Sequence, residues 1–335
     1  MPEANQRKHS LNTRPAFSPR GNNSCPRASW LESRVSLALM KSSHHARVNR
    51  AYHQPKHGGR DARVVKTIHR AILCRISRRK RLRSGMGRLE FERTKKILER
   101  FMPSPPAVVL DVGGGTGPYS FWLAELGYET HLIDQSERLV QLCRDRVQAN
   151  ALRPGLRSVE LGDARSLAWR DRSSDAVLML GPLYHLVERT DRGKAIREAH
   201  RILRPGGYLF AATISRFASF IAALSEGRLT DNTFVPIVEA DLRSGHHRNP
   251  TDNISFFTDA FFHRNAEIRG ELEEGGFSIA GQIPIEGLGC VVRDIEVVWA
   301  DPPGKEALLN LVAQTDMIDE ISGMSFHFMT VGRKA

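Results

Sequence analysis

Cysteine is scarce in this chain of 335 residues, and the few cysteines form no pattern. All four lie far apart and none belongs to a C-x-x-C pair: Cys25, Cys74, Cys143 and Cys290. Structural zinc sites and disulfide frameworks both need clustered cysteines. The sequence therefore predicts neither a metal site nor a disulfide scaffold, and it favours a reducing, cytoplasmic setting.

Long apolar runs are missing as well. No segment approaches the roughly 18 consecutive apolar residues of a transmembrane helix, and the N-terminus lacks the apolar core of a secretory signal. We therefore expect a soluble protein without a membrane span.

Acidic residues are rare in the first quarter of the chain. Residues 1–85 contain 20 lysines and arginines but only 3 acids, a net charge of +17, whereas residues 86–335 carry a net charge of −5. The excess positive charge therefore does not indicate that the remainder binds nucleic acid. These first 85 residues, the leader, also have too little apolar surface to offset chain entropy, so we expect them to be mostly disordered.

Three interpretations of the leader stay open. The basic run at residues 75–83 would bind nucleic acid or an acidic membrane surface. The Arg- and Ser-rich, acid-poor composition is also typical of an organelle transit peptide. We favour a third interpretation, a leader without a function of its own ahead of a domain that begins at Met86, because tails without a pattern are seldom specific.

The strongest pattern is an apolar strand that runs into a glycine turn. Residues 108–112 read Val-Val-Leu-Asp-Val, and Gly113-Gly114-Gly115-Thr116-Gly117-Pro118 follows, ahead of a helix near Tyr119. Glycine permits positive φ and lets the backbone come close to a ligand. We therefore expect a ligand here, with backbone N–H groups and the helix N-terminus facing its carboxylate, ribose or phosphate.

The identity of that ligand depends on the spacing of the glycines. The dinucleotide fingerprint G-x-G-x-x-G has its third glycine where this chain has Pro118, which weakens the alternative of a nicotinamide-dependent oxidoreductase. Residues 110–117 instead resemble the first motif of the class I S-adenosylmethionine-dependent methyltransferases, in which the glycine loop passes under the methionine part of the cofactor.

Two later strands end in acidic residues at the spacing of that family. Residues 129–133 form a predicted strand that ends at Asp134, where a carboxylate accepts hydrogen bonds from ribose hydroxyls or caps the next helix. Residues 158–161 lead into Gly162-Asp163-Ala164, which resembles the family motif that contacts the adenine ring.

Residues 175–180 are almost continuously apolar, which is typical of a central strand buried on both faces. They run into Gly181-Pro182-Leu183-Tyr184-His185-Leu186, at the sheet edge where open α/β proteins bind substrates. This hexapeptide resembles the fourth-strand motif of family members that act on small molecules. Asn/Asp-Pro-Pro-aromatic and Pro-Cys, the motifs of nucleic-acid amino methylation and cytosine C5 methylation, do not occur here.

The remaining periodicities fit the same fold. We predict helices at residues 87–101, 119–126, 137–149, 191–203 and 265–273, a turn at 204–207, and strands at 208–213, 277–285 and 324–331. The apolar face of the helix at 137–149 places Cys143 in the core. Residues 215–262 are predicted to be a substrate cap with two short helices, in which His246 and His247 form a solvated turn. Either His263 or His327 could reach the active site, but we expect both to be packed.

The resemblance covers residues 86–335 and implies an α/β, Rossmann-like, seven-stranded sheet in the order 3-2-1-4-5-7-6. Strand 7 is antiparallel, helices cover both faces, and a small helical cap is inserted. It implies S-adenosylmethionine as the methyl donor, a small-molecule acceptor, no metal, and no nucleic acid bound to the folded domain. The alternative function is an RNA-associated methyltransferase, or an inactive nucleic-acid-binding protein that uses the leader.

The resemblance also implies the site residues. Those expected to bind the cofactor are Asp111, Gly113, Gly114, Gly115, Thr116, Gly117, Asp134, Gln135, Asp163, Ala164, Leu180 and Gly181. Tyr184 and His185 are the expected catalytic residues, with His185 as general base if the acceptor is a hydroxyl.

Overall fold

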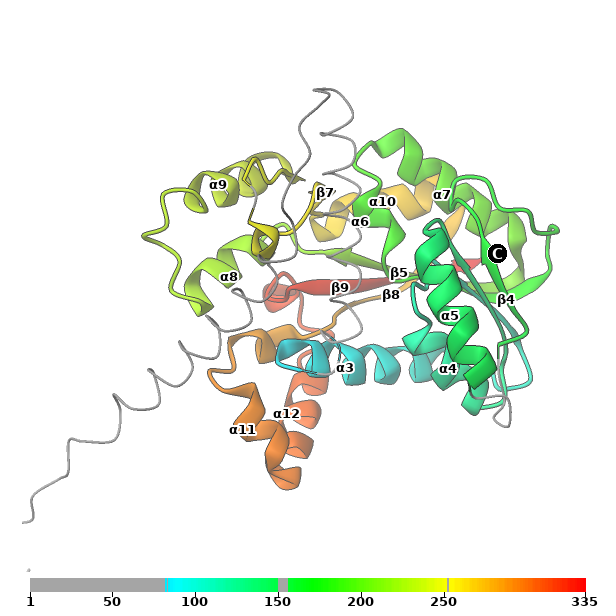
Figure 1. The fold of residues 1–335 in the computed structure, drawn as a ribbon, viewed down its shortest axis with the longest axis horizontal. Helices are drawn as coiled ribbons and strands as arrows, with labels where there is room; N and C mark the ends of the chain where they lie inside the picture. Colours follow the sequence, from blue (N-terminus) through cyan, green and yellow to red (C-terminus); the bar gives the residue numbers. More distant parts are fainter. Residues whose placement is uncertain (1–81, 83, 150–155, 252) are drawn as a thin grey trace, which may run out of the picture. The chain divides into compact units, whose positions relative to one another are not determined.

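The computed structural model describes residues 82, 84–149, 156–251 and 253–335 (Figure 1). Cys25, Cys74 and nearly all of the leader lie outside the described residues, so the predictions about them stay predictions.

The structure contains the strands β1 (Val108–Val112), β2 (Glu129–Asp134), β3 (Ser158–Leu161), β4 (Ser174–Met179), β5 (Leu203–Ile214), β6 (His246–His247), β7 (Ala260–Phe261), β8 (Phe277–Pro284) and β9 (His327–Lys334). Its α-helices are α3 (Met86–Phe101), α4 (Pro118–Glu125), α5 (Glu137–Ala149), α6 (Pro182–His185), α7 (Arg189–Ile202), α8 (Ala218–Ser225), α9 (Val235–Ser244), α10 (Asn265–Glu274), α11 (Ile295–Ala300) and α12 (Pro302–Gln314).

Seven strands form one sheet in the order β3-β2-β1-β4-β5-β9-β8. The first five are parallel, and β9 runs antiparallel to both of its neighbours, β5 and β8. With β8 and β9 as the sixth and seventh strands, this confirms the predicted order and the antiparallel seventh strand.

The central strand β4 buries side chains on both of its faces, as its apolar run predicts. Val177 and Met179 pack with residues of α7 and α10, whereas Ala176 and Leu178 pack with residues of α3 and α4. In Figure 1, α10 accordingly lies on one side of β9 and α3 on the other. Helices therefore cover both faces of the sheet, as predicted. Cys143 of α5 is completely buried in a smaller cluster between α4 and α5, also as predicted.

The fifth strand begins earlier than predicted. Arg204-Pro205-Gly206-Gly207, expected to be a turn before the strand, lies inside β5, which starts at Leu203. Ser174 of β4 pairs with Leu203 and Ala176 pairs with Tyr208, so the four residues form an irregularity within the pairing. Gly206 takes a φ of +82°, which glycine tolerates and which lets the strand resume. The residues that favour a turn are therefore present, but β5 begins before them and its pairing with β4 resumes after them.

The insertion at residues 215–262 contains α8 and α9, as expected, and the short hairpin of β6 and β7. The prediction of a solvated turn at His246 and His247 was wrong for His247, whose side chain is buried. Its Nδ1 lies 2.8 Å from Asp241 Oδ2, its Nε2 lies 2.7 Å from the Phe256 carbonyl oxygen, and its ring stacks on Phe262. The β6–β7 pairing brings this histidine inside, and local sequence does not reveal that pairing.

The prediction assigned no element to residues 286–323, where the structure has α11, α12 and two short 3-10 helices. None of the described helices combines the length and the apolar character needed to cross a bilayer.

Candidate active site

A cleft of about 1030 Å³, open solvent included, lies where the parallel strands β1 to β4 end. The carboxyl ends of these strands meet at one edge of the sheet, so the segments that follow them converge on the same space. The cleft is lined by the glycine turn after β1, by Asp134 at the end of β2, by Asp163 after β3 and by residues 180–182 and 184–186 after β4.

The glycine turn has the backbone conformation that its sequence predicts. Gly113, Gly115 and Gly117 have φ values of +74°, +62° and +74°. A Cβ on Gly113 would lie 2.8 Å from Pro182 Cγ, and one on Gly114 would lie 2.7 Å from the carboxylate of Asp111. Both contacts are shorter than carbon atoms tolerate, so the turn packs closely against its neighbours only because side chains are absent.

The backbone N–H groups of the four glycines, which were predicted to face a ligand, instead donate within the protein. Those of Gly113 and Gly114 donate to the Ile133 carbonyl, that of Gly115 donates to Asp134, and that of Gly117 donates to the Gly114 carbonyl. The turn is folded back onto β2, so it presents bare backbone to the cleft. A nest of amide donors, the usual cradle for phosphate, is therefore not offered by these four glycines.

Asp134 lies beside this turn and connects it to β2. Its Oδ2 accepts from the Gly115 N–H at 2.9 Å and its Oδ1 accepts from the Ser136 N–H at 2.8 Å. Each carboxylate oxygen thus holds one backbone N–H, and the two hydrogen bonds fix the orientation of the carboxylate at the lining of the cleft.

Asp111 is the acidic residue of β1. It is almost completely buried, although it borders the cleft. Ser120 Oγ donates to its Oδ2. Burial raises the pKa of the Asp111 carboxyl to about 7, and the nearby Asp134 charge adds to this effect, while the Ser120 hydrogen bond acts against it. The folded chain therefore holds a proton on Asp111 at pH values where the unfolded chain has lost it.

This difference predicts a pH dependence of stability. Between about pH 4 and pH 7 the folded state binds one proton more than the unfolded state at Asp111, so the free energy of unfolding falls as pH rises. Asp111 contributes up to about 1.4 kcal/mol per pH unit to this slope. In Asp111→Asn this part of the slope is expected to be absent. Urea unfolding of both proteins across this pH range measures the two slopes, and equal slopes would contradict the assignment.

Asp163 lines the cleft at the β3 side, next to Ala164. Its carboxylate is held by Arg165, with Nη2 at 2.6 Å from Oδ2, and Arg165 also bonds Asp191 at 2.7 Å. The hydrogen bonds from Arg165 lower the pKa of Asp163 below its usual value. This acidic group is ionised, but its charge is matched by a neighbour.

Tyr184 and His185, the predicted catalytic residues, both line the cleft from the single turn of α6. Their rings lie 4.7 Å apart, and His185 stacks on Phe257 of the insertion at residues 215–262 at 5.9 Å. Tyr184 is buried and His185 is half-buried, so the imidazole is the more accessible of the two. The cleft thus has an aromatic wall beside the end of β4.

Of the residues predicted to bind the cofactor, all but Gly117 line the cleft. Gly117 is the N-cap of α4, and a Cβ there would lie 3.2 Å from Cys143, Leu132 and Phe121. Its role in the structure is therefore close packing of the turn against α5 and β2.

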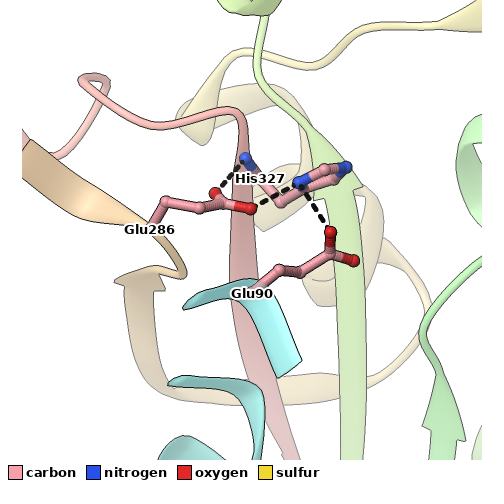
Figure 2. A group of neighbouring side chains, drawn as sticks. All are labelled: Glu90, Glu286 and His327. Atoms are coloured by element: carbon pink, nitrogen blue, oxygen red, sulfur yellow. Dashed lines mark hydrogen bonds and ion pairs between the residues drawn. The ribbon is translucent and has the colours of Figure 1, made fainter. Parts of the chain in front are cut away.

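One acidic lining residue, Glu90 of α3, was not predicted. It lies near Glu286 and His327, and one ligand atom of each lies within 4.8 Å of the others (Figure 2). Glu286 accepts from the His327 N–H, from Ser325 Oγ and, at 2.8 Å, from His327 Nδ1. The three come from distant parts of the chain, so no local pattern could have joined them, although Glu90 lies on a predicted helix.

Comparison with known proteins agrees with this geometry. Residues 110–211 match the family model described as "Methyltransferase domain". The methyltransferase GfsG of Streptomyces halstedii is 35% identical over 122 residues, 36% of this chain and 42% of that protein. The ubiquinone/menaquinone biosynthesis C-methyltransferase UbiE of Acidiphilium cryptum is 34% identical over 115 residues, 34% of this chain and 45% of that protein. The chain thus spans less than half the length of these curated relatives.

Among solved structures, the PH0226 protein of Pyrococcus horikoshii has a TM-score of 0.50 and 17% identity, covering 75% of this chain and 92% of that chain. At this identity the likeness concerns the fold alone. Residues 110–211 of this chain thus match a methyltransferase domain, and the sheet order and the glycine turn of the structure agree with that match.

Proposed function

We propose that this chain transfers the methyl group of S-adenosylmethionine to a small-molecule acceptor. The observation that carries the proposal is the pairing of Asp134 with a glycine turn whose amides are already engaged, both at the edge of one cleft. S-adenosylmethionine supplies a methyl group that its sulfonium already activates. The chain therefore has only to bind the cofactor, to orient the acceptor toward the methyl group and to exclude water.

The same turn distinguishes this cofactor from a dinucleotide. A pyrophosphate needs amide donors or a helix N-terminus free of other partners. Here the Gly113, Gly114 and Gly115 amides donate to β2, so they do not face the cleft as donors. A nucleoside whose ribose is held by Asp134 fits this surface better than one that carries two phosphates.

On the acceptor side, we propose His185 as the general base and Tyr184 as its aromatic neighbour. Both residues follow β4 and line the cleft, 4.7 Å apart between ring centres. An imidazole at this position can remove the proton that an attacking hydroxyl or ammonium must lose. The motif that contains them resembles that of family members acting on small molecules, and UbiE is named for a small-molecule pathway.

Calorimetry with S-adenosylhomocysteine and, separately, with NAD⁺ tests the cofactor. We expect S-adenosylhomocysteine to bind at one site per chain and NAD⁺ not to bind. For the acceptor, methyl-labelled S-adenosylmethionine is incubated with the protein and either a small-molecule extract or purified RNA. Label in the small-molecule extract supports the proposal, whereas label in the RNA alone supports the RNA-directed alternative.

Asp134→Asn is expected to weaken S-adenosylhomocysteine binding by about 10- to 100-fold, because hydrogen bonds to a charged acceptor contribute about 1.5–3 kcal/mol. Asp145→Asn is the matched control, since Asp145 lies on the exposed side of α5 and bonds Gln141. Urea unfolding of both variants separates lost binding from lost structure. Equal affinities for the two variants would remove Asp134 from the binding site.

A further inference from the structure

Phe257 has a backbone conformation that bulky residues almost never adopt. It follows the short 3-10 helix Ile254–Phe256 of the insertion, with a φ of +69° and a ψ of −177°. This region of backbone dihedrals belongs essentially to glycine, because the backbone crowds a Cβ there. Such a conformation persists only where its surroundings impose it, and conformations of this kind are concentrated at functional sites.

Buried polar side chains hold the carbonyl groups on both sides of the Phe257 Cα. His247 Nε2 lies 2.7 Å from the Phe256 carbonyl oxygen, and Asn249 Nδ2 donates to the Phe257 carbonyl oxygen at 2.9 Å. Asn249 Nδ2 also donates to the Asn253 carbonyl oxygen at 2.8 Å. Both His247 and Asn249 are buried. The peptide groups before and after Phe257 are therefore fixed, and with them its φ and ψ.

The ring of Phe257 is thereby placed against the aromatic residues that follow β4. It stacks on the His185 imidazole, with ring centres 5.9 Å apart and an angle of 22° between the planes, and its centre lies 6.4 Å from that of Tyr184. Tyr184 and His185 line the cleft, whereas Phe257 is not among the described residues that do so. Phe257 therefore acts on methyl transfer through the imidazole rather than by touching the acceptor.

The orientation of this imidazole matters for the proposed function. A general base must lie within hydrogen-bond reach of the proton that it removes, and a displacement of about 1 Å costs up to about 100-fold in rate. His185 is half-buried at the end of a single helical turn, so its ring can rotate unless neighbouring groups oppose the rotation. The stacked Phe257 ring is one such group.

We propose that Phe257 is a positioning residue for methyl transfer: the insertion holds it in a strained conformation so that its ring sets the plane of the His185 imidazole. This inference rests on the proposed function, because it gives the proposed general base a partner. Packing alone does not require an aromatic side chain at a position whose backbone conformation suits glycine. The position of the ring over His185 explains why a phenylalanine is held there.

Phe257→Gly and Phe257→Ala together test the strain. Both substitutions remove the ring, but alanine keeps a Cβ at the positive φ. At an unstrained position alanine is the more stable of the two, because glycine gives the unfolded chain more conformational freedom. At position 257 we expect the reverse, with Phe257→Gly unfolding at the higher urea concentration. A higher midpoint for Phe257→Ala would show that no strain is held there and would overturn the proposal.

A double-mutant cycle tests the positioning role. Phe257→Leu keeps an apolar side chain but has no flat ring. Transfer of label from methyl-labelled S-adenosylmethionine into the small-molecule extract is measured for the parent chain, Phe257→Leu, His185→Ala and the double variant. We expect Phe257→Leu to slow the parent chain about tenfold, and to slow His185→Ala less than about twofold, since the two residues act as a unit. Phe220→Leu, exposed on α8 of the same insertion, is the control and should keep the parental rate.

Nuclear magnetic resonance of protein with isotope-labelled histidine measures the stacking without turnover. An aromatic ring stacked on an imidazole changes the resonance of its Cε1 proton. The His185 resonance, assigned by its absence in His185→Ala, should therefore move in Phe257→Leu and stay in place in Phe220→Leu. An unmoved resonance in Phe257→Leu, a parental rate in Phe257→Leu, or equal slowing in both backgrounds would overturn the proposal. If the parent chain neither binds S-adenosylhomocysteine nor transfers label, the proposed function fails, and the resonance still shows whether Phe257 stacks on the imidazole.

Discussion

Replacing Glu271 with glutamine is expected to lower the free energy of unfolding by about 3–5 kcal/mol, because it leaves a buried guanidinium without its counter-charge. Arg192 of α7 and Glu271 of α10 are both almost completely buried. Arg192 bonds both carboxylate oxygens, at 2.7 Å from Nη2 to Oε1 and 2.9 Å from Nε to Oε2. Its guanidinium carbon also lies 4.1 Å from the centre of the Phe261 ring.

The charge state of Glu271 supports this expectation. Burial alone would raise the pKa of its carboxyl, but the neighbouring His263 and Arg192 outweigh that effect and lower the pKa to about 2. The stabilisation from this pair is therefore present above the ordinary glutamate value of 4.5 and is lost as pH falls from 4.5 toward 2. Between pH 5 and pH 8 the loss caused by the substitution should stay constant.

Glu274→Gln is the matched control. Glu274 lies on the same helix, is exposed, and pairs only across the surface with Arg189. Exposed ion pairs contribute about 0–1 kcal/mol, so this variant should be nearly as stable as the parent chain. Urea unfolding followed by circular dichroism measures both. A loss below about 1 kcal/mol for Glu271→Gln would show that the pair is not needed to keep Arg192 buried.

The same pair supports the cleft. Nη1 of Arg192 donates to the carbonyl oxygens of Leu186 and Val187, immediately after the turn that carries Tyr184 and His185. Loss of Glu271 therefore releases the anchor of that turn as well as a buried charge.

Replacing His185 with alanine is expected to slow methyl transfer by about 10²- to 10⁴-fold, the usual contribution of a general base. The rate is measured with labelled S-adenosylmethionine and the acceptor found in the small-molecule extract. The affinity for S-adenosylhomocysteine should stay within a few-fold of the parent value, because the cofactor is proposed to lie at the glycine turn and Asp134. The loss of rate at low pH that an imidazole base causes should disappear.

His246→Ala is the control for this substitution. His246 is exposed in the insertion at residues 215–262, forms a T-shaped ring contact with Phe261, and is not among the residues that line the cleft. Its removal should leave the rate unchanged. If His185→Ala transfers methyl groups as fast as the parent chain at every pH, His185 has no part in proton removal.

Local patterns in the sequence were sufficient to predict the strands that build the site. The apolar runs before Gly113 and Gly181 are β1 and β4, whose residues are buried on both faces, and their sheet order follows from the family resemblance. Glycine at position 114 has a local reason, since a Cβ there would meet Asp111. Such signals lie within a few residues of the feature they predict.

The parts that were missed depend on contacts between distant residues. Glu90, Glu286 and His327 are separated by more than 40 residues at each step, so their meeting depends on the completed sheet. The amides of the glycine turn were expected to face a ligand, but the turn's contact with Ile133 on β2 uses them. His247 was predicted to be solvated because the hairpin that buries it has only two residues in each strand.

The position of β9 has a consequence for synthesis on the ribosome. Strand β8 is made first, yet in the sheet it is paired only with β9. Until residues 327–334 have emerged, the nascent chain can hold at most the five parallel strands, with the hydrogen-bonding edge of β5 open. Exposed strand edges of this kind pair with other chains. Ribosomes paused within α12 would therefore carry a nascent chain prone to aggregation, and a chaperone that covers the β5 edge at that moment would raise the yield of folded protein.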